Sequence, residues 1–428
     1  MNNYKIIQYN NINEICYEYS HKSGLKAYVV PKKGYSKKYA AFATKYGSMD
    51  NEFIVPSGEN SIIVPDGIAH FLEHKLFEQE DGSVMDKFAA LGSSPNAYTS
   101  FNKTAYLFSC TDQFNENLKL LIDYVQNPYL TDENVEKEKG IIAQEIMMYE
   151  DDPEFKAYYN LLKALYAKNP VRNGVAGTKE SVMSINRETL MKCYDTFYHP
   201  SNMMIIVVGD LIPEEVFDII DAGIKACEAR PKIERIFPEE PEGITQKYIM
   251  EKVHISAPIF EIGIKCKDIK GDIDEIKSRS VAMKLIMKEL FDNGSEVYER
   301  LFKDGLINDS FGFDFSMEAN YSHAIIGGES RDPELVREII TEYIAAKQKS
   351  GLVEETFNRN KKAYKGSFLK RFNSVESIAS SFISEYFRGT FMFDYYDVYD
   401  KITIGYANKL LSTEFDPQKI AMSVVYPI

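Results

Sequence analysis

The sequence predicts an α+β protein made of two tandem copies of one unit, which face each other across a cleft. Its 428 residues exceed what one ordinary domain core needs. The same order of strand-like and helical segments recurs in both halves. Between the halves, residues 229–248 contain three prolines among alternating charges, which is typical of a linker. We therefore expect a first α+β domain at 1–228 and a homologous one at 249–428.

The first half reads as two strands, a helix, a strand-like segment and two further helices. Alternating apolar and polar residues predict strands at 25–31, 38–47 and 96–110. Apolar residues spaced three and four apart predict helices at 66–78, 112–126 and 131–150.

The second half repeats this order. It has strand-like segments at 260–267 and 311–329 and helical ones at 280–292, 332–348 and 353–372. The first helices align through Leu76 and Leu290 at an offset of 214 residues (290 minus 76). The later helices align through Leu130 and Leu352 at 222 (352 minus 130). Because ligands usually bind in clefts between domains, we expect the site there.

Composition excludes several classes of protein. The 29 Tyr and 26 Phe residues argue against a disordered chain. A net charge of -14 argues against nucleic acid and anionic membrane as partners. No apolar stretch is long enough to cross a bilayer, and the first residues do not have the pattern of a secretory signal. The five cysteines form neither a disulfide framework nor a metal-binding pair, which predicts a cytoplasmic location.

The segment 70–74 carries the strongest chemical signal. It reads His70-Phe71-Leu72-Glu73-His74, in a chain with only six histidines. On a helix, residues four apart lie one above the other, so both imidazoles can reach one ion and Glu73 shares their face. This order of residues is the inverted zinc-protease pattern. A catalytic zinc takes three protein ligands, so one ligand must come from elsewhere.

Two acids on a later helix are candidates for that role. Glu138 and Glu145 are seven residues apart. They therefore differ by only about 20° around the helix axis. Without the histidine motif, a solvated charged face would explain them better. With the motif, they become candidate metal-site residues.

In these residues the sequence resembles the pitrilysin/insulysin family of zinc metallopeptidases, the inverzincins, over essentially its whole length. Residues 93–100 (SSPNAYTS) are similar to the family's edge strand, and residues 198–203 (YHPSNM) to its Y-x-P-x-N-M segment. The sequence looks closest to short bacterial members, which are similar to mitochondrial processing peptidase. The resemblance implies two homologous domains, each a mainly antiparallel sheet covered by helices, which form half of a clamshell chamber.

The resemblance also implies roles for individual residues. One Zn²⁺ per chain would be held by His70, His74 and Glu145, which lies 71 residues after His74. Glu138 would orient a ligand from behind the metal site. Glu73 would be the general base that activates a zinc-bound water. The strand that contains Asn96, Ala97 and Thr99 would bind an extended peptide substrate.

The second half lacks these residues. At the first offset, Lys284, Met287 and Lys288 replace His70, Glu73 and His74, and at the second offset Ser367 replaces Glu145. The family places an arginine and a tyrosine in this half, where they help to hold substrate. Phe302 and Asn308 occupy those positions here. The resemblance therefore implies a homodimer, or a heterodimer in which this chain carries the metal and a homologous subunit supplies the Arg/Tyr pair.

We thus predict a zinc-dependent endopeptidase that cleaves peptides or processes a precursor in a closed chamber. Two alternatives remain open from the sequence: a scaffold or assembly subunit without hydrolytic activity, and a zinc-dependent protein that binds peptides without turnover. Asn96 and Thr99 could equally be ordinary turn and strand residues. Substrate identity, and the choice among Zn, Mn and Co, also stay open.

Overall fold

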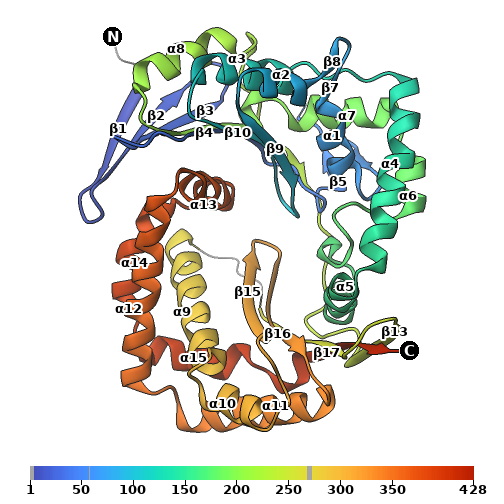
Figure 1. Cartoon of the computed structure of the whole chain (residues 1–428), viewed down its shortest axis with the longest axis vertical. Helices are drawn as coiled ribbons and strands as arrows, with labels where there is room; N and C mark the ends of the chain where they lie inside the picture. Colours follow the sequence, from blue (N-terminus) through green and yellow to red (C-terminus); the bar gives the residue numbers. More distant parts are fainter. Residues whose placement is uncertain (1–3, 57, 268–271) are drawn as a thin grey trace. The chain divides into compact units, whose positions relative to one another are not determined.

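The computed structural model describes residues 4–56, 58–267 and 272–428, and these form two compact units (Figure 1). Unit 1 contains residues 1–146, 174–236 and 369–393, and unit 2 contains 147–173, 237–368 and 394–428. Each unit thus includes a segment from the other half of the sequence. The predicted linker at 229–248 contains the boundary between residues 236 and 237. The division into 1–228 and 249–428 stays a prediction about the sequence repeat.

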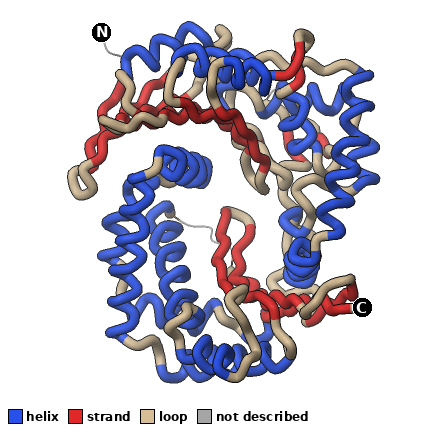
Figure 2. The backbone as a smooth tube through the Cα atoms, viewed as in Figure 1, coloured by secondary structure: helices blue, strands red, loops and turns tan. Residues whose placement is uncertain are grey.

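Unit 1 is built on a sheet of seven strands in the order β1-β2-β3-β11-β4-β10-β9. Figure 2 shows this sheet in red, with helices in blue along it. Its members are β1 (Tyr4–Tyr9), β2 (Glu14–Ser20), β3 (Lys26–Pro31), β4 (Lys38–Thr44), β9 (Ser94–Thr99), β10 (Thr104–Cys110) and β11 (Met203–Gly209). All neighbouring pairs are antiparallel except β3 and β11. The central strand β11 is buried along its whole length, which explains its continuous apolar sequence.

The helices of unit 1 are α1 (Ile68–Leu76), α2 (Val84–Ala90), α3 (Phe114–Val125), α4 (Asp132–Asp151), α6 (Lys179–Ser184), α7 (Arg187–Phe197), α8 (Pro213–Gly223) and α13 (Val375–Arg388), of which α4 ends in unit 2. Of these, α1, α2, α3, α8 and α13 pack against the sheet. The sequence-distant helix α13 packs against β4 and β11. Tyr28 on β3 and Phe382 on α13 have ring centroids 4.7 Å apart. Short strands complete the unit: β5 (Glu52–Ile54), β6 (Ser61–Ile63), β7 (Glu78–Gln79), β8 (Gly82–Ser83) and β12 (Glu234–Arg235).

Unit 2 has a five-stranded sheet in the order β13-β17-β14-β16-β15. Its strands are β13 (Tyr248–Val253), β14 (Ile259–Lys265), β15 (Gly312–Glu318), β16 (Tyr321–Glu329) and β17 (Ile420–Pro427). Its helices are α5 (Pro153–Leu165), α9 (Ile273–Phe291), α10 (Glu296–Lys303), α11 (Pro333–Ser350), α12 (Glu354–Lys370), α14 (Tyr395–Lys401) and α15 (Ile404–Glu414), of which α12 ends in unit 1. Helix α5 packs against β13, β14 and β17.

The two sheets share one topology. In unit 1 the strands β3, β4, β9, β10 and β11 follow the spatial order β3-β11-β4-β10-β9, and in unit 2 β13 to β17 follow the same order. The first and last strand of each set are parallel neighbours, and the other pairs are antiparallel. This repeat confirms the predicted α+β fold of two homologous, mainly antiparallel units covered by helices. No helix in the described part of the chain is long and apolar enough to cross a membrane.

Candidate metal centre

Helix α1 carries the histidine motif and is anchored by its apolar side chains. Phe71 and Leu72 are fully buried. Burial of two such side chains stabilises the helix position by roughly 1.5–3 kcal/mol each. Gly67, the residue directly before the helix, has a φ of +86°. A Cβ atom there would lie 2.2 Å from the carbonyl oxygen of Ala176, so only glycine fits.

Helix α4 brings the two predicted acids to the same place. It starts with reciprocal hydrogen bonds between Thr131 and Asn134, in which each backbone N–H donates to the other residue's side chain. Its buried side includes Val135, Glu138, Ile142 and Ile146, at spacings of three and four. Glu145 lies close to that side and is partly buried. The seven-residue spacing therefore turns both carboxylates toward α1.

Three predicted ligands converge. His70 Nε2 lies 3.7 Å from Glu145 Oε1, and His74 Nε2 lies 3.4 Å from Glu145 Oε2. One ligand atom from each of these residues lies within 4.8 Å of the others. Among the described residues, this is the one group of three His, Cys, Asp or Glu side chains that is close enough to share an ion.

Burial and neighbouring charges set the protonation of the site. Burial, aided by the nearby His74, lowers the pKa of His70 to about 4, so this ring is neutral at pH 7 and can offer a lone pair. Burial alone would lower the pKa of His74, but its hydrogen bond to Glu138 and the charges of Glu145 and Glu73 raise it instead. Burial raises the pKa of Glu73 despite its hydrogen bond from Thr99. A glutamate with a raised pKa is a stronger base than a solvated one.

Glu138 contacts the ring nitrogen of His74 that does not face Glu145. Its Oε1 atom lies 3.1 Å from His74 Nδ1. This contact keeps the proton on Nδ1 and leaves Nε2 free to bind a metal. Burial opposes the charge of Glu138, but His74 and Lys75 outweigh it and lower the pKa of Glu138.

Lys75 was not predicted to belong to the site. Its side chain is completely buried, and Nζ donates to Glu78 and, at 3.3 Å, to the carbonyl oxygen of Asn134. Nζ also lies 3.8 Å from Glu138 Oε2. A buried cation therefore stabilises the carboxylate that orients His74. Its position one residue after the motif, among apolar helix residues, was the one signal in the sequence.

Thr99 contacts the predicted base directly. Its hydroxyl donates a hydrogen bond of 2.7 Å to Glu73 Oε2. This contact fixes one carboxylate oxygen and leaves the other for a reacting group. The sequence predicts Thr99 only as a residue of the substrate-binding strand. Its hydrogen bond to Glu73 is a finding of the structure.

Asn96 and Ala97 lie on the edge strand β9. β9 pairs with β10 on one side and has no strand neighbour on the other, among the strands that the structure describes. The side chain of Asn96 accepts a hydrogen bond of 2.9 Å from the backbone N–H of Ala97. The open edge can therefore offer backbone groups to an extended peptide. Their role in substrate binding stays a prediction.

The donor set fits zinc. Two imidazole nitrogens and a carboxylate are common zinc ligands, and tetrahedral ligands at about 2.0–2.2 Å lie roughly 3.4 Å from one another. The distances of 3.4 and 3.7 Å from Glu145 to the two rings are close to this value. Zinc would be held by His70, His74 and Glu145.

We predict that Lys75→Met weakens zinc binding by about 10- to 100-fold, as other changes behind metal ligands do. Methionine fits the apolar surroundings, but Glu138 loses its buried cation. Competition with a fluorescent chelator measures the zinc dissociation constant. Lys87→Met is the matched control, because Lys87 pairs with exposed Asp81 on the surface. Equal affinities of wild type and Lys75→Met would contradict this role for Lys75.

Unit 2 has no counterpart of the metal centre in its described residues. Met287 is buried in α9, and Phe302, at the expected arginine position, is 48% exposed. Asn308 donates to Glu329 at 2.7 Å.

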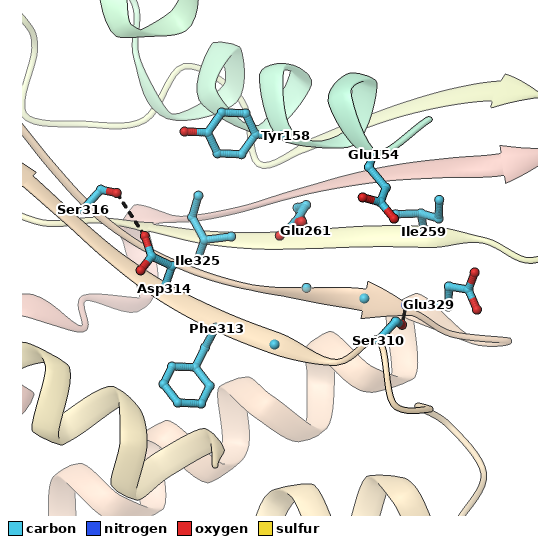
Figure 3. A pocket seen from close by; sticks show the side chains of 13 residues that line it. Glu154, Tyr158, Ile259, Glu261, Ser310, Phe313, Asp314, Ser316, Ile325 and Glu329 are labelled. Carbon is cyan, nitrogen blue, oxygen red and sulfur yellow. Dashed lines mark hydrogen bonds between the residues drawn. The ribbon is translucent and has the colours of Figure 1, made fainter. Parts of the chain in front are cut away.

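Unit 2 instead contains an acidic pocket of about 350 Å³ (Figure 3). Glu154, Glu261, Asp314 and Glu329 line it, together with apolar residues such as Ile259 and Ile325. The Oε2 atom of Glu261 is buried without a hydrogen-bond partner, and burial next to Glu154 raises the pKa of Glu261 to about 8. Because its pKa lies above 7, Glu261 is largely protonated and uncharged at neutral pH.

Comparisons with known proteins agree with this geometry. Residues 64–179 match the family described as Insulinase (Peptidase family M16), and residues 184–364 match the Peptidase M16 inactive domain. The chain is 40% identical over 99% of both chains to a Bacillus subtilis (strain 168) protein named uncharacterized zinc protease YmfH. It is 29% identical, over 36% of its length and 30% of the relative's, to an Arabidopsis thaliana protein named probable mitochondrial-processing peptidase subunit beta.

Solved structures show the same fold. An M16-like peptidase from Alicyclobacillus acidocaldarius superposes with a TM-score of 0.92 at 34% identity, with 99% of both chains covered. A protease from Helicobacter pylori superposes with a TM-score of 0.82 at 17% identity, over 96% of this chain and 99% of that one.

Proposed function

The chain belongs to the insulinase-type M16 peptidase family, and on that premise we propose that it is a zinc-dependent endopeptidase that cleaves peptides or processes a precursor. The observation that carries this proposal is the convergence of His70, His74 and Glu145 beside Glu73. A non-hydrolytic scaffold has no need for this buried cluster, which is costly without a metal.

Each residue of the site has a role in the proposed reaction. When bound, zinc supplies a Lewis acid that makes water more acidic and polarises the peptide carbonyl. Glu73 accepts the proton of the attacking water and returns it to the leaving amine. Thr99 keeps the Glu73 carboxylate in place through its 2.7 Å hydrogen bond. Glu138 and Lys75 keep His74 in the tautomer that can bind metal.

The proposed substrate is an extended peptide. The open edge of β9, with Asn96 and Ala97, can pair with a peptide backbone and so bind many sequences.

The missing Arg/Tyr pair supports a dimer. Phe302 and Asn308 cannot supply a guanidinium and a phenol, so we propose a homologous partner subunit that does. The chain would then be the metal-carrying subunit of a heterodimer, or act as a homodimer if the pair is dispensable. The cytoplasm is the proposed location, since the cysteines form no disulfide in the described structure.

Hydrolysis of a quenched fluorescent peptide tests the function. We expect a metal chelator to reduce hydrolysis to background and one equivalent of zinc per chain to restore it. Mixing with a homologous subunit that carries the Arg/Tyr pair should raise turnover. No gain on mixing would contradict the heterodimer. No hydrolysis by the zinc-loaded chain, alone or mixed, would contradict the peptidase and favour the scaffold.

A further inference from the structure

Unit 1 has a second pocket, of about 510 Å³, whose charge is opposite to that of the protein as a whole. It is called the basic pocket here, after the six basic residues among those that line it: Lys45, His199, Arg230, Lys232, Arg235 and Arg388. None of the described residues that line it is Asp or Glu, although the chain has 64 acidic residues against 50 Lys and Arg. Its volume is in the range of small-molecule sites.

The basic pocket is assembled from segments far apart in the sequence. His199 lies between α7 and β11, Arg230 and Lys232 precede β12, and Arg388 ends α13. The ligands of the metal centre do not line this pocket. It is therefore a separate site within the same unit.

Two arginines that line the basic pocket, Arg235 and Arg388, already form ion pairs with carboxylates. Arg235 Nε donates to Asp50 Oδ1 at 2.8 Å, and Arg388 Nη1 donates to Glu385 Oε1 at 2.9 Å. These bonds hold the guanidinium groups in place. They also neutralise much of their charge, so neither is the main source of attraction for a ligand.

Arg230 and Lys232 have uncompensated charges. Both are exposed, and in the described part of the chain neither forms an ion pair. Arg230 is positioned by neutral groups only: Nη1 donates to the carbonyl oxygen of Asp195 at 3.1 Å, and its backbone N–H donates to Ser201 Oγ at 2.8 Å. Two free cations at one opening attract an anion.

His199 adds an unsatisfied donor. The residue is only 9% exposed, and its Nε2 atom is buried without a hydrogen-bond partner. Its Nδ1 atom accepts a hydrogen bond of 3.3 Å from the backbone N–H of Ser201. Burial, with the charge of Arg230, lowers the pKa of His199 to about 4, so the neutral ring carries its proton on Nε2. A buried N–H without an acceptor is costly, which points to an acceptor that a ligand supplies.

We propose that the basic pocket binds a phosphate-bearing small molecule, with Arg230 and Lys232 contacting its anionic oxygens and the Nε2–H of His199 donating to one of them. A carboxylate offers two oxygens and one charge, whereas a phosphate or a phosphate chain offers several of each. A phosphate group therefore suits two separate cations and an additional N–H donor better than a carboxylate does. This site is independent of the proposed peptidase activity.

Titration calorimetry of the full chain with inorganic phosphate, pyrophosphate and triphosphate tests the proposal at about 0.15 M ionic strength, where weak surface attraction is screened. We expect one saturable site per chain. The double variant Arg230→Gln, Lys232→Gln should bind at least about tenfold more weakly. The control double variant Lys33→Gln, Lys119→Gln removes the same charge from exposed positions that do not line the pocket, and should bind like wild type.

Two further measurements separate this site from the alternatives. Binding should persist in Glu145→Gln, because the phosphate does not occupy the metal centre. In protein labelled with ¹⁵N-histidine, the ligand should shift the Nε2–H signal of His199, identified by its loss in His199→Gln. Absence of saturable binding, an equal loss in the control variant, loss in Glu145→Gln, or an unmoved His199 signal would each overturn the proposal.

Discussion

Replacing Glu73 with Gln is expected to lower kcat for peptide hydrolysis by about 10²- to 10⁴-fold, the usual contribution of a general base. Glutamine keeps the size of the side chain and can still interact with Thr99, which now donates to Glu73 at 2.7 Å. It cannot accept a proton from water. Zinc content and KM should stay close to those of wild type, since Glu73 is not a predicted ligand. Steady-state hydrolysis of a fluorescent peptide measures both constants.

Glu80→Gln provides the control for this variant. Glu80 follows the same helix, is exposed, and lies outside the site. The Glu80→Gln variant should hydrolyse the peptide at the wild-type rate. Undiminished turnover in Glu73→Gln would exclude Glu73 as the base. Loss of zinc in that variant would instead show that Glu73 holds the metal.

The second large effect is expected for Glu145→Gln, which should weaken zinc binding by about 100-fold or more. Glu145 faces both imidazoles, at 3.7 Å from His70 and 3.4 Å from His74. Removing its charge takes away one of three ligands, which exceeds the 10- to 100-fold effect of changes behind the ligands. Hydrolysis should fall in parallel at low zinc, and zinc titration with a competing chelator measures the affinity.

Glu150→Gln tests whether this effect is specific. Glu150 lies on the same helix, α4, and is exposed. The Glu150→Gln variant should bind zinc with the same affinity as wild type. If Glu145→Gln retained wild-type affinity, the third ligand would have to be another residue, and Glu138 would be the first candidate because it contacts His74.

The parts of the site that depend on helical periodicity could be predicted from the sequence. His70 and His74 are one turn apart on α1, and Glu138 and Glu145 are two turns apart on α4. In both cases a fixed period places the side chains on one face, whatever the tertiary structure. The repeated order of segments likewise predicted two similar sheets, and the shared strand order bears this out.

Features that depend on packing could not be predicted. The hydrogen bond from Thr99 to Glu73 requires that β9 lie beside α1, and no local pattern encodes that contact. The place of Lys75 directly after the motif hints at a role, but its burial and its contact with Glu138 depend on the packing of α1 against α4. The interleaving of the units has the same origin, because α13 packs on the sheet of unit 1 although it follows most of unit 2 in sequence.

The zinc content of the natively purified wild-type chain, measured by inorganic mass spectrometry, tests the central claim most directly. The geometry of His70, His74 and Glu145 predicts close to one zinc per chain. The value should fall when the chain is dialysed against a chelator and return on addition of zinc. A chain that is purified without metal and cannot be loaded with zinc would contradict the account, and would leave a scaffold with the peptidase fold.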